Sequence, residues 1–269
     1  MRNPEKYKLL VEGLEEEVGA WRVRRGRLRY LVAGPVAGRK RVEKEYWLKK
    51  FGCDGILFDL DGVLVDSTAV VVRTWREWAE RQNLDAEYLL EMAHGRRAVE
   101  VVRHMMPESD AEAEVRELEG IEVENVGSVL EIEGARELLA SLSPNAWTVV
   151  TSGGRRLAAG RMEHLGLPVP GRIVTADDVE NGKPHPEPYL KGAEILGARP
   201  EACVVIEDAP SGVAAARAAG MSVVAIAATY SARDLLEADV VVGGLKEIEV
   251  VRRSERGGGD ERLEVRVGR

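Results

Sequence analysis

The feature that most constrains the fold of this chain is a series of short apolar runs that alternate with helical segments. The runs show no regular alternation of apolar and polar side chains, which is typical of strands buried on both faces of a parallel sheet. Crossover helices between such strands give a doubly wound α/β fold, the Rossmann-like class. The five runs that we expect to form the sheet are 56–58, 147–150, 172–174, 204–206 and 223–226.

One connection in this pattern is too long for a simple crossover. Most of the interval from Asp59 to Thr151 reads as helical, and Trp75, Trp78 and Ala79 are spaced to share one buried helix face. We therefore expect a small helical domain inserted into the core. The expected domains are an N-terminal extension (1–50), a core (51–68 and 133–251), a helical cap (69–132) and a C-terminal tail (252–269).

The two ends of the chain differ from this core. Residues 1–50 hold 14 Lys and Arg against 7 Asp and Glu, a net charge of +7. The whole chain has a net charge of −8, so the remainder carries −15. A helix over 7–18 and a short hairpin over 21–30 are expected there. A basic surface for RNA or another polyanion, a loosely attached extension and a start codon placed too early stay open as explanations. A second hairpin is expected where 248–251 and 263–267 flank a glycine-rich turn.

The composition limits the function classes. An acidic body argues against nucleic acid as the main ligand. No apolar run approaches the roughly 20 residues of a membrane span, and no signal peptide is evident, so we expect a cytoplasmic protein. We also expect it to be a monomer. Cys53 and Cys203 each lie beside an apolar run, which predicts buried reduced thiols and no disulfide framework.

The first candidate motif follows the run 56–58. Asp59 and Asp61 come at the C-terminal end of this expected strand, where doubly wound folds bind their ligands, and Gly62 allows a sharp turn. Two carboxylates held so close repel each other unless a cation lies between them, and Mg²⁺ is the natural oxygen-binding candidate. The alternative is that Asp59 caps the next helix while Asp61 and Gly62 form a turn.

Two further segments offer groups for a phosphate. Thr151, Ser152 and Gly153 follow the strand at 147–150, and their hydroxyl and backbone N–H groups suit a phosphoryl oxygen, although such loops also cap helices. Lys183 lies in a segment fixed by three prolines. A lysine held in place can balance the charge of a nucleophilic carboxylate and a phosphoryl group, the alternative being a solvated lysine on a rigid surface loop.

The fourth segment is a second acidic strand end. The run 204–206 leads directly into Glu207 and Asp208, which supplies further oxygen ligands for a cation beside Asp59. Parallel strands bring such ends to one edge of the sheet, so unrelated helix caps are a weaker explanation. A helix is expected over 213–219, with Ser211 as its N-cap and Gly220 just past its end.

These four segments, in this order and spacing, resemble the motifs of the haloacid dehalogenase superfamily of phosphotransferases, over about residues 55–251. The resemblance implies a Rossmann-like core with a helical cap, Mg²⁺ as cofactor and an aspartyl-phosphate intermediate. It implies the following roles: Asp59 as nucleophile, Asp61 as general acid and base, Thr151 as a phosphate-binding hydroxyl, Lys183 as the charge-balancing lysine, and Asp59, Asp61, Glu207 and Asp208 as the metal site.

The cap and core segments are further similar to the sugar phosphatases and glycerol-3-phosphatases within this superfamily. The similarity includes His94, Gly95, Arg96 and Arg97, which we expect in a loop of the cap that faces the site, with solvated basic residues as the alternative. It implies a small sugar or polyol phosphate as substrate. Val63, where many members have Thr, and the basic extension are departures.

Three rival functions follow from the same motifs. A β-phosphoglucomutase-like enzyme would return the phosphate to a sugar hydroxyl instead of to water. A metal-independent dehalogenase has no use for Asp61 or for the acidic pair at Glu207 and Asp208. A non-catalytic binding module predicts that some key residue is missing, whereas all are present.

Overall fold

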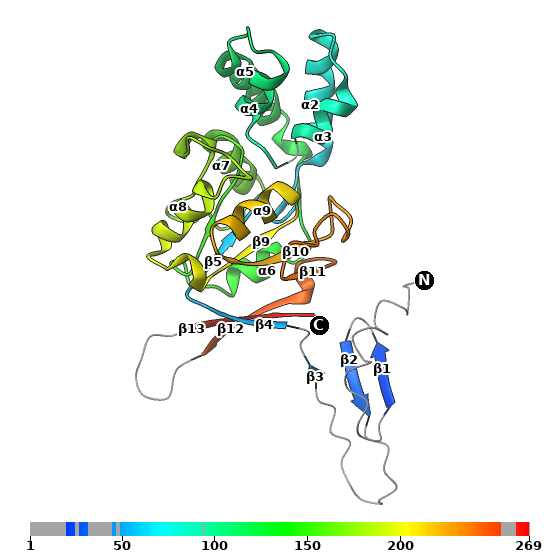
Figure 1. Ribbon diagram of the computed structural model, residues 1–269, viewed down its shortest axis with the longest axis vertical. Coiled ribbons are helices and arrows are strands. Elements are labelled where there is room, and N and C mark those ends of the chain that lie inside the picture. The colour runs from blue at the N-terminus through cyan, green and yellow to red at the C-terminus, as the bar shows by residue number, and fades with distance from the viewer. Residues whose placement is uncertain are drawn as a thin grey trace, which may run out of the picture. The chain divides into compact units, whose positions relative to one another are not determined.

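The computed structural model of the chain divides into two compact units (Figure 1). The first contains residues 1–48 with 268–269, and the second is Lys49–Val267. The residues that the structure describes are 20–24, 27–31, 45–46, 49–93, 95–253 and 262–268.

The first unit contains a small antiparallel sheet, in the order β1-β2-β3. Its first two strands confirm the hairpin expected over 21–30, whereas the expected helix over 7–18 lies outside the described residues. The strands are β1 (Ala20–Arg24), β2 (Arg27–Leu31) and β3 (Glu45–Tyr46).

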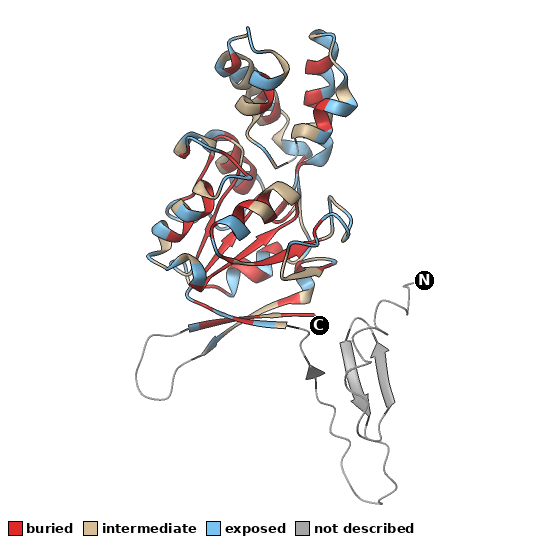
Figure 2. Ribbon diagram, viewed as in Figure 1, coloured by how far each residue is buried: buried red, intermediate tan, exposed pale blue. Residues whose placement is uncertain are grey.

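The second unit is built on a parallel sheet of five strands in the order β11-β10-β9-β5-β8. Every residue of its three strands β9, β5 and β8 is buried, as the continuous apolar runs predicted (Figure 2). The expected α/β class with a central parallel sheet is confirmed. The strands are β5 (Gly55–Phe58), β8 (Trp147–Val149), β9 (Cys203–Glu207), β10 (Ser222–Ile226) and β11 (Val240–Val242).

Helices cover both faces of this sheet, because successive strand side chains point to opposite sides. Ile56 and Phe58 pack in one apolar cluster with α6 and α7, and Leu57 packs in another with α8 and α9. The helices are α6 (Ala135–Ala140), α7 (Arg155–His164), α8 (Glu187–Leu196) and α9 (Pro210–Ala218), with short 3₁₀ turns η3 (Ala176–Asp178), η4 (Pro200–Ala202) and η5 (Leu245–Glu247).

One expectation about the sheet is wrong, and one strand was missed. The strand expected over 172–174 is reduced to one bridge between Val150 and Val174: Val174 exchanges backbone hydrogen bonds with Val149 and Thr151 (2.9 Å each), whereas the Arg172 carbonyl accepts from the Thr148 hydroxyl (2.7 Å). Strand β11 was not expected at all.

The N-cap expected at Ser211 is also wrong. Helix α9 already begins at Pro210, the residue before Ser211, and Ala209, which has an extended backbone, is its N-cap. The fixed φ of proline suits the first helical position, where no backbone N–H is needed. Gly220 follows the helix with a φ of +79°, as expected for the residue past its end.

The long insertion after β5 forms a cap of four helices with its own apolar core. Trp75, Trp78 and Ala79 are buried in that core, which confirms the expected helix face. A two-stranded ladder of β6 and β7 joins the cap to the core at its base. The elements are β6 (Val65–Asp66), α2 (Thr68–Arg81), α3 (Ala86–Ala93), α4 (Ala98–Met105), α5 (Ala111–Glu124), η2 (Val126–Ser128) and β7 (Leu130–Glu131).

A third, antiparallel sheet in the order β12-β13-β4 closes the second unit. Strands β12 (Ile248–Arg253) and β13 (Arg262–Val267) confirm the expected C-terminal hairpin. Strand β4 (Lys49–Cys53) pairs with β13, so the second unit begins at Lys49, two residues before the expected start of the core. Within the described part of the chain, no helix combines the length and apolarity needed to cross a membrane.

Candidate active site

The C-terminal ends of β5, β8 and β9 bring the predicted site residues together at one edge of the sheet. Asp59 follows β5, Thr151 follows β8 at the short bridge of Val150, and Glu207 and Asp208 end β9. The Asp59 backbone N–H donates to the Ile206 carbonyl (3.0 Å), which continues the ladder as far as Asp59. This is the edge at which doubly wound sheets bind ligands.

Three buried carboxylates form the centre of this edge. Asp59, Glu207 and Asp208 each place one carboxylate oxygen so that all three atoms lie within 4.8 Å of one another. Burial raises the pKa of Asp59 to about 7, with Lys183 opposing the rise and Glu207 adding to it. Burial, then Glu207 and Asp59, also raise the pKa of Asp208. The protein therefore holds these charges close at an electrostatic cost.

Lys183 is the cation that faces this cluster. Its ammonium donates to Asp59 Oδ1 (2.5 Å), Glu207 Oε1 (2.8 Å) and the Val150 carbonyl (3.1 Å), and its side chain is 1% exposed. Burial alone would lower the pKa of Lys183, but the two carboxylates raise it above its ordinary value, so the ammonium stays charged. The structure therefore places Lys183 in contact with Asp59.

Glu207 is held on both of its oxygens. Oε1 accepts from Lys183 and from the Tyr189 hydroxyl (2.9 Å), and Oε2 accepts from the backbone N–H groups of Asp208 and Ala209 (2.8 Å each). A Cβ at Gly212 would lie 1.6 Å from Oε1, so only glycine fits beside this carboxylate. These contacts fix Glu207 behind Asp59 and Asp208.

The donor set fits a divalent cation. When all three carboxylates are ionised, the one ammonium leaves two negative charges uncompensated among these four groups. Carboxylate oxygens are the ligands that hard cations prefer. Gly62 has a φ of +82°, and a Cβ there would lie 1.9 Å from Asp208 Oδ2. The turn after Asp61 therefore approaches Asp208 as closely as it does only because residue 62 is glycine.

Asp61 lies apart from this carboxylate cluster. Its Oδ1 accepts from the Ser67 hydroxyl and from Arg161 Nη1, both at 2.6 Å, and its side chain is 31% exposed toward the pocket. The sequence placed Asp61 both among the metal ligands and as the acid. The position of its carboxylate suits a group that exchanges protons with a bound molecule.

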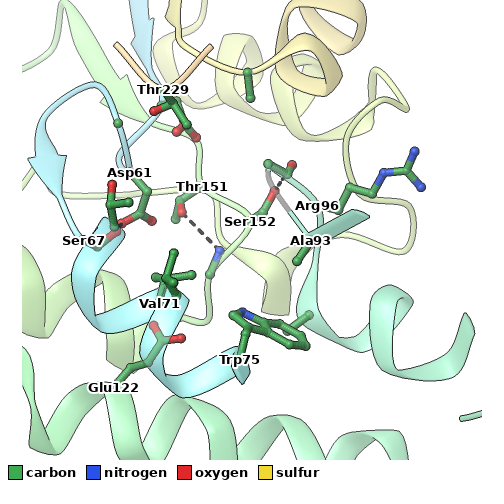
Figure 3. A pocket seen from close by; sticks show the side chains of 18 of the residues that line it. Asp61, Ser67, Val71, Trp75, Ala93, Arg96, Glu122, Thr151, Ser152 and Thr229 are labelled. Carbon is green, nitrogen blue, oxygen red and sulfur yellow. Dashed lines mark hydrogen bonds between the residues drawn. The ribbon is translucent and has the colours of Figure 1, made fainter. Parts of the chain in front are cut away.

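The loop after β8 connects the core to the cap. Thr151 lines the pocket, and its Oγ1 accepts from the Gly153 N–H (3.1 Å). The Ser152 hydroxyl donates to the Gly95 carbonyl in the cap (2.9 Å) (Figure 3). The Gly154 N–H donates to Glu119 Oε1 (2.7 Å). Thr151, Ser152 and Gly153 thus all line the pocket, with Ser152 in contact with the cap.

The predicted cap loop is only partly directed at the pocket. Gly95 has a φ of +72° and lines the pocket together with exposed Arg96. His94 lies outside the described residues. Arg97 instead donates to the Glu180 carbonyl (2.7 Å) and to Glu100 (3.3 Å).

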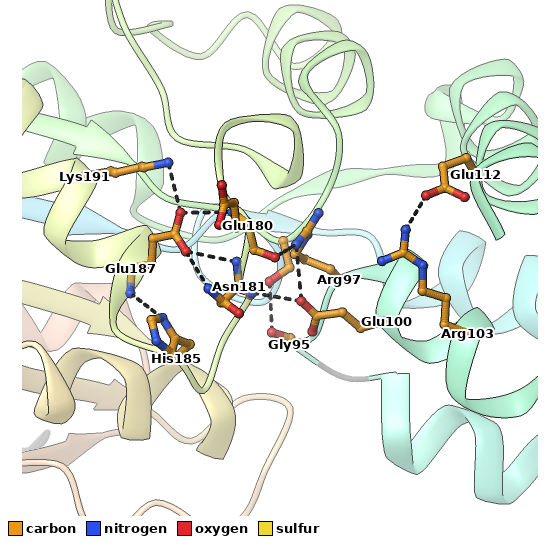
Figure 4. Close-up of polar contacts among 12 residues, drawn as sticks. Gly95, Arg97, Glu100, Arg103, Glu112, Glu180, Asn181, His185, Glu187 and Lys191 are labelled. Atoms are coloured by element: carbon orange, nitrogen blue, oxygen red, sulfur yellow. Dashed lines mark hydrogen bonds and ion pairs between the residues drawn. The ribbon is translucent and has the colours of Figure 1, made fainter. Parts of the chain in front are cut away.

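Arg97 and Glu100 hold the segment that carries Lys183. Glu100 Oε1 accepts from the Gly182 N–H (2.8 Å), so α4 contacts the chain next to Lys183 (Figure 4). From the other side, Glu187 accepts from the backbone N–H groups of Glu180 and Asn181 (2.9 Å each). The lysine loop is therefore fixed by both the cap and α8.

The pocket also contains charged residues that the sequence did not single out. Glu119 and Glu122 of α5 and Arg161 of α7 line it, as do the apolar side chains of Val71 and Trp75. Figure 3 shows Glu122 beside these two apolar side chains. The pKa of Glu122 is raised to about 7, and burial is the main cause. In the sequence, the spacing of Glu119 and Glu122 reads as the solvated face of an amphipathic helix, and nothing local shows that this face covers a site.

Comparison with known proteins identifies similar chains. Residues 56–226 match the family model described as haloacid dehalogenase-like hydrolase. Hexitol phosphatase A of Escherichia coli is 43% identical, over 74% of this chain and 95% of the relative. Glycerol-1-phosphate phosphohydrolase 2 of Saccharomyces cerevisiae is 37% identical, over 72% and 83%. 2-Deoxyglucose-6-phosphate phosphatase 1 of the same yeast is 32% identical, over 78% and 95%.

A solved structure agrees with the fold. The crystal structure of β-phosphoglucomutase from Clostridium difficile superposes with a TM-score of 0.65 at 23% identity, over 73% of this chain and 93% of that one. At this identity the likeness concerns the fold alone.

Proposed function

The chain belongs to the haloacid dehalogenase-like hydrolases, and from that premise we propose that it hydrolyses the phosphate monoester of a small sugar or polyol through an aspartyl phosphate on Asp59. One observation carries the proposal. Asp59 lies buried at the sheet edge, 2.5 Å from Lys183 and beside the acidic pair Glu207 and Asp208, and it lines a pocket that the cap covers.

We propose Mg²⁺ as the cofactor, held by Asp59 and Asp208, with Glu207 close behind them and Asp61 at the margin. Bound there, the ion would neutralise carboxylate charge and polarise the phosphoryl oxygens. The support is the donor set, because the carboxylates carry more negative charge than Lys183 balances.

The chain's own residues account for the proton and bond changes. Asp59 attacks phosphorus as the P–O bond to the leaving alcohol breaks, and Asp61 gives its proton to the departing alkoxide. Asp61 then accepts a proton from the water that attacks the aspartyl phosphate, which releases inorganic phosphate and restores Asp59. Lys183 and the Thr151 hydroxyl offset the negative charge of the phosphoryl oxygens.

The cap would select the leaving group. We propose that residues 69–132 form this unit on a core of 51–68 and 133–251, and that Gly95 and Arg96 face the leaving alcohol together with α2 and α5. Arg97, which binds Glu180, would act on the substrate only indirectly. A cytoplasmic location and a monomeric enzyme acting on a free metabolite stay predictions.

The named relatives favour hydrolysis over mutase chemistry. Each of the three is described as a phosphatase or phosphohydrolase of a sugar or polyol phosphate, at 32–43% identity. The β-phosphoglucomutase has 23% sequence identity to this chain and is similar in fold. Inorganic phosphate release, measured against isomer formation from glucose 1-phosphate, distinguishes the two activities.

The experiment is an assay of purified full-length protein on hexitol, glycerol and 2-deoxyglucose phosphates, with Mg²⁺ and with EDTA, beside Asp59→Asn. We expect phosphate release that requires both the metal and Asp59. Asp66→Asn, an exposed carboxylate of the same segment, is the matched control and should stay active. Activity that survives both EDTA and Asp59→Asn would refute the proposal.

A further inference from the structure

Arg161 joins the catalytic acid to the cap. It lies on core helix α7, its side chain is 3% exposed, and its two terminal nitrogens bind different partners. Nη1 donates to Asp61 Oδ1 at 2.6 Å, and Nη2 donates to Glu122 on cap helix α5. One buried guanidinium on the core helix α7 therefore binds both the loop after β5, at Asp61, and the cap, at Glu122.

The contacts of Asp61 show which group Arg161 can orient. Ser67 and Arg161 both donate to Oδ1, so two hydrogen bonds from different elements fix the orientation of the carboxyl group. Neither contact falls on Oδ2. A proton donor works only when its proton lies in line with the departing oxygen, so the orientation of Asp61 controls the first chemical step.

Burial of the group argues against a purely structural role. The Nε–H of Arg161 is buried and has no acceptor among the described residues, which is a cost that an apolar side chain at this position would avoid. Glu122 is also buried, at 7% exposure, and burial raises its pKa. The two charges are held where solvent helps neither, between the cap and the acid.

We propose that Arg161 is a positioning residue that orients Asp61 for proton transfer, and that Glu122 holds Arg161 in this position when the cap covers the site. The proposal rests on the proposed function, because it assigns Arg161 to the acid step of that reaction. Opening of the cap would remove Glu122 from the guanidinium and leave Asp61 less constrained. Closure around substrate and alignment of the acid are thereby coupled.

Two substrates of the same enzyme separate positioning from folding. Glycerol 1-phosphate has an alkoxide leaving group that needs a proton, whereas p-nitrophenyl phosphate has a leaving group that departs without one. In Arg161→Met, we expect the rate of the first turnover with glycerol 1-phosphate to fall about 100-fold, and that with p-nitrophenyl phosphate to change less than about threefold. Arg161→Lys, which keeps the charge, should recover part of the loss.

The cap contact is tested by Glu122→Gln and by the double variant. Glu122→Gln should slow the first turnover of glycerol 1-phosphate about tenfold, and in the Arg161→Met background it should have no further effect, because the two residues act as one unit. Arg156→Met on α7 and Glu124→Gln on α5 are matched controls; both residues are exposed and should give wild-type rates.

Each outcome decides the matter. Equal slowing of both substrates, no slowing of either, or effects of the two substitutions that multiply would overturn the role of Arg161. If Arg161→Met does not fold, the substrate split in Arg161→Lys and Glu122→Gln decides instead. A wild-type enzyme that releases phosphate from p-nitrophenyl phosphate and from none of the hexitol, glycerol and 2-deoxyglucose phosphates would refute the proposed substrate class, and one that releases none from any of the four would refute the proposed function itself.

Discussion

At the scale of single residues, the balance of buried charge decides what the site can do. Asp59, Glu207 and Asp208 repel one another while they are largely buried, and Lys183 compensates only part of their charge. The site is therefore stable only with its counter-charges, and its properties should follow pH and metal.

Removal of the lysine should destabilise the fold. Lys183→Met leaves Asp59 and Glu207 buried without their cation, so we expect the free energy of unfolding to drop by about 3–5 kcal/mol in urea titrations without metal. Lys246→Met removes an exposed partner of Glu133 and should cost about 1 kcal/mol or less. Equal stability of the two variants would show that the buried pair does not have the assigned role.

Metal binding should strengthen as pH rises through about 7. The pKa of Asp59 is raised to about 7, so below that pH the carboxyl is increasingly protonated and must lose its proton to bind a cation. Calorimetric titration with Mg²⁺ in two buffers of different ionisation enthalpy should show proton release at pH 6.5 that becomes smaller toward pH 9.

The same shift acts on the stability of the metal-free protein. The folded pKa of Asp59 lies above its ordinary value, so the native state binds more protons than the unfolded state between about pH 4 and 7. This contribution to stability is fully present below that window and is lost as pH rises through 7. A contribution of Asp59 that grew with pH, measured as the difference from Asp59→Asn in urea, would contradict the assignment.

At the scale of elements, continuous apolar runs and the residues that end them predicted most of the core. The runs at 56–58, 204–206 and 223–226 became strands because a buried parallel strand needs apolar side chains on both faces. The run at 172–174 forms only a bridge at Val174, and the backbone carbonyl of Arg172 accepts a hydrogen bond from the Thr148 hydroxyl. Local sequence carries no sign of such a choice.

The cap part of the site was harder to predict, because its geometry depends on tertiary packing and not on local sequence. Asp59, Thr151, Lys183 and Asp208 occupy strand ends and a rigid loop, whose positions follow from topology. The direction of Arg97 toward Glu180 depends on how helices of the cap pack over the core, and that packing is a tertiary property.

Two glycines in different helices, α9 and α7, should respond oppositely to an added methyl group. Gly212→Ala places Cβ 1.6 Å from Glu207 Oε1, so we expect it to displace that carboxylate and abolish most activity. Gly160→Ala, within helix α7, has nothing within 4 Å of its Cβ. It should keep wild-type activity and raise stability by about 0.4–1 kcal/mol, because alanine has less freedom in the unfolded chain.

The assays are phosphate release and thermal unfolding of the two alanine variants. An active Gly212→Ala enzyme would mean that Glu207 need not be fixed, and a destabilised Gly160→Ala protein would mean that the helix packs more closely than described.

At the scale of the whole molecule, the second unit encloses both cysteines in its apolar clusters. Burial raises the pKa of Cys53 to about 12 and that of Cys203 to about 11, so neither thiol forms the reactive thiolate near neutral pH. A thiol reagent at pH 8 should label neither in the native protein and both in denaturant. Rapid native labelling would contradict the packing of the sheet.

The central claim is that Asp59 becomes phosphorylated, and the most direct measurement is its capture. Asp61→Asn should still be phosphorylated by p-nitrophenyl phosphate, whose leaving group needs no proton, but should hydrolyse the intermediate slowly because it lacks the base. After acid quenching and digestion, mass spectrometry should find one phosphoryl group on the peptide that contains Asp59, labile to hydroxylamine and absent from the Asp59→Asn, Asp61→Asn double variant. A phosphoryl group on any other residue, or none while phosphate is released, would contradict the account.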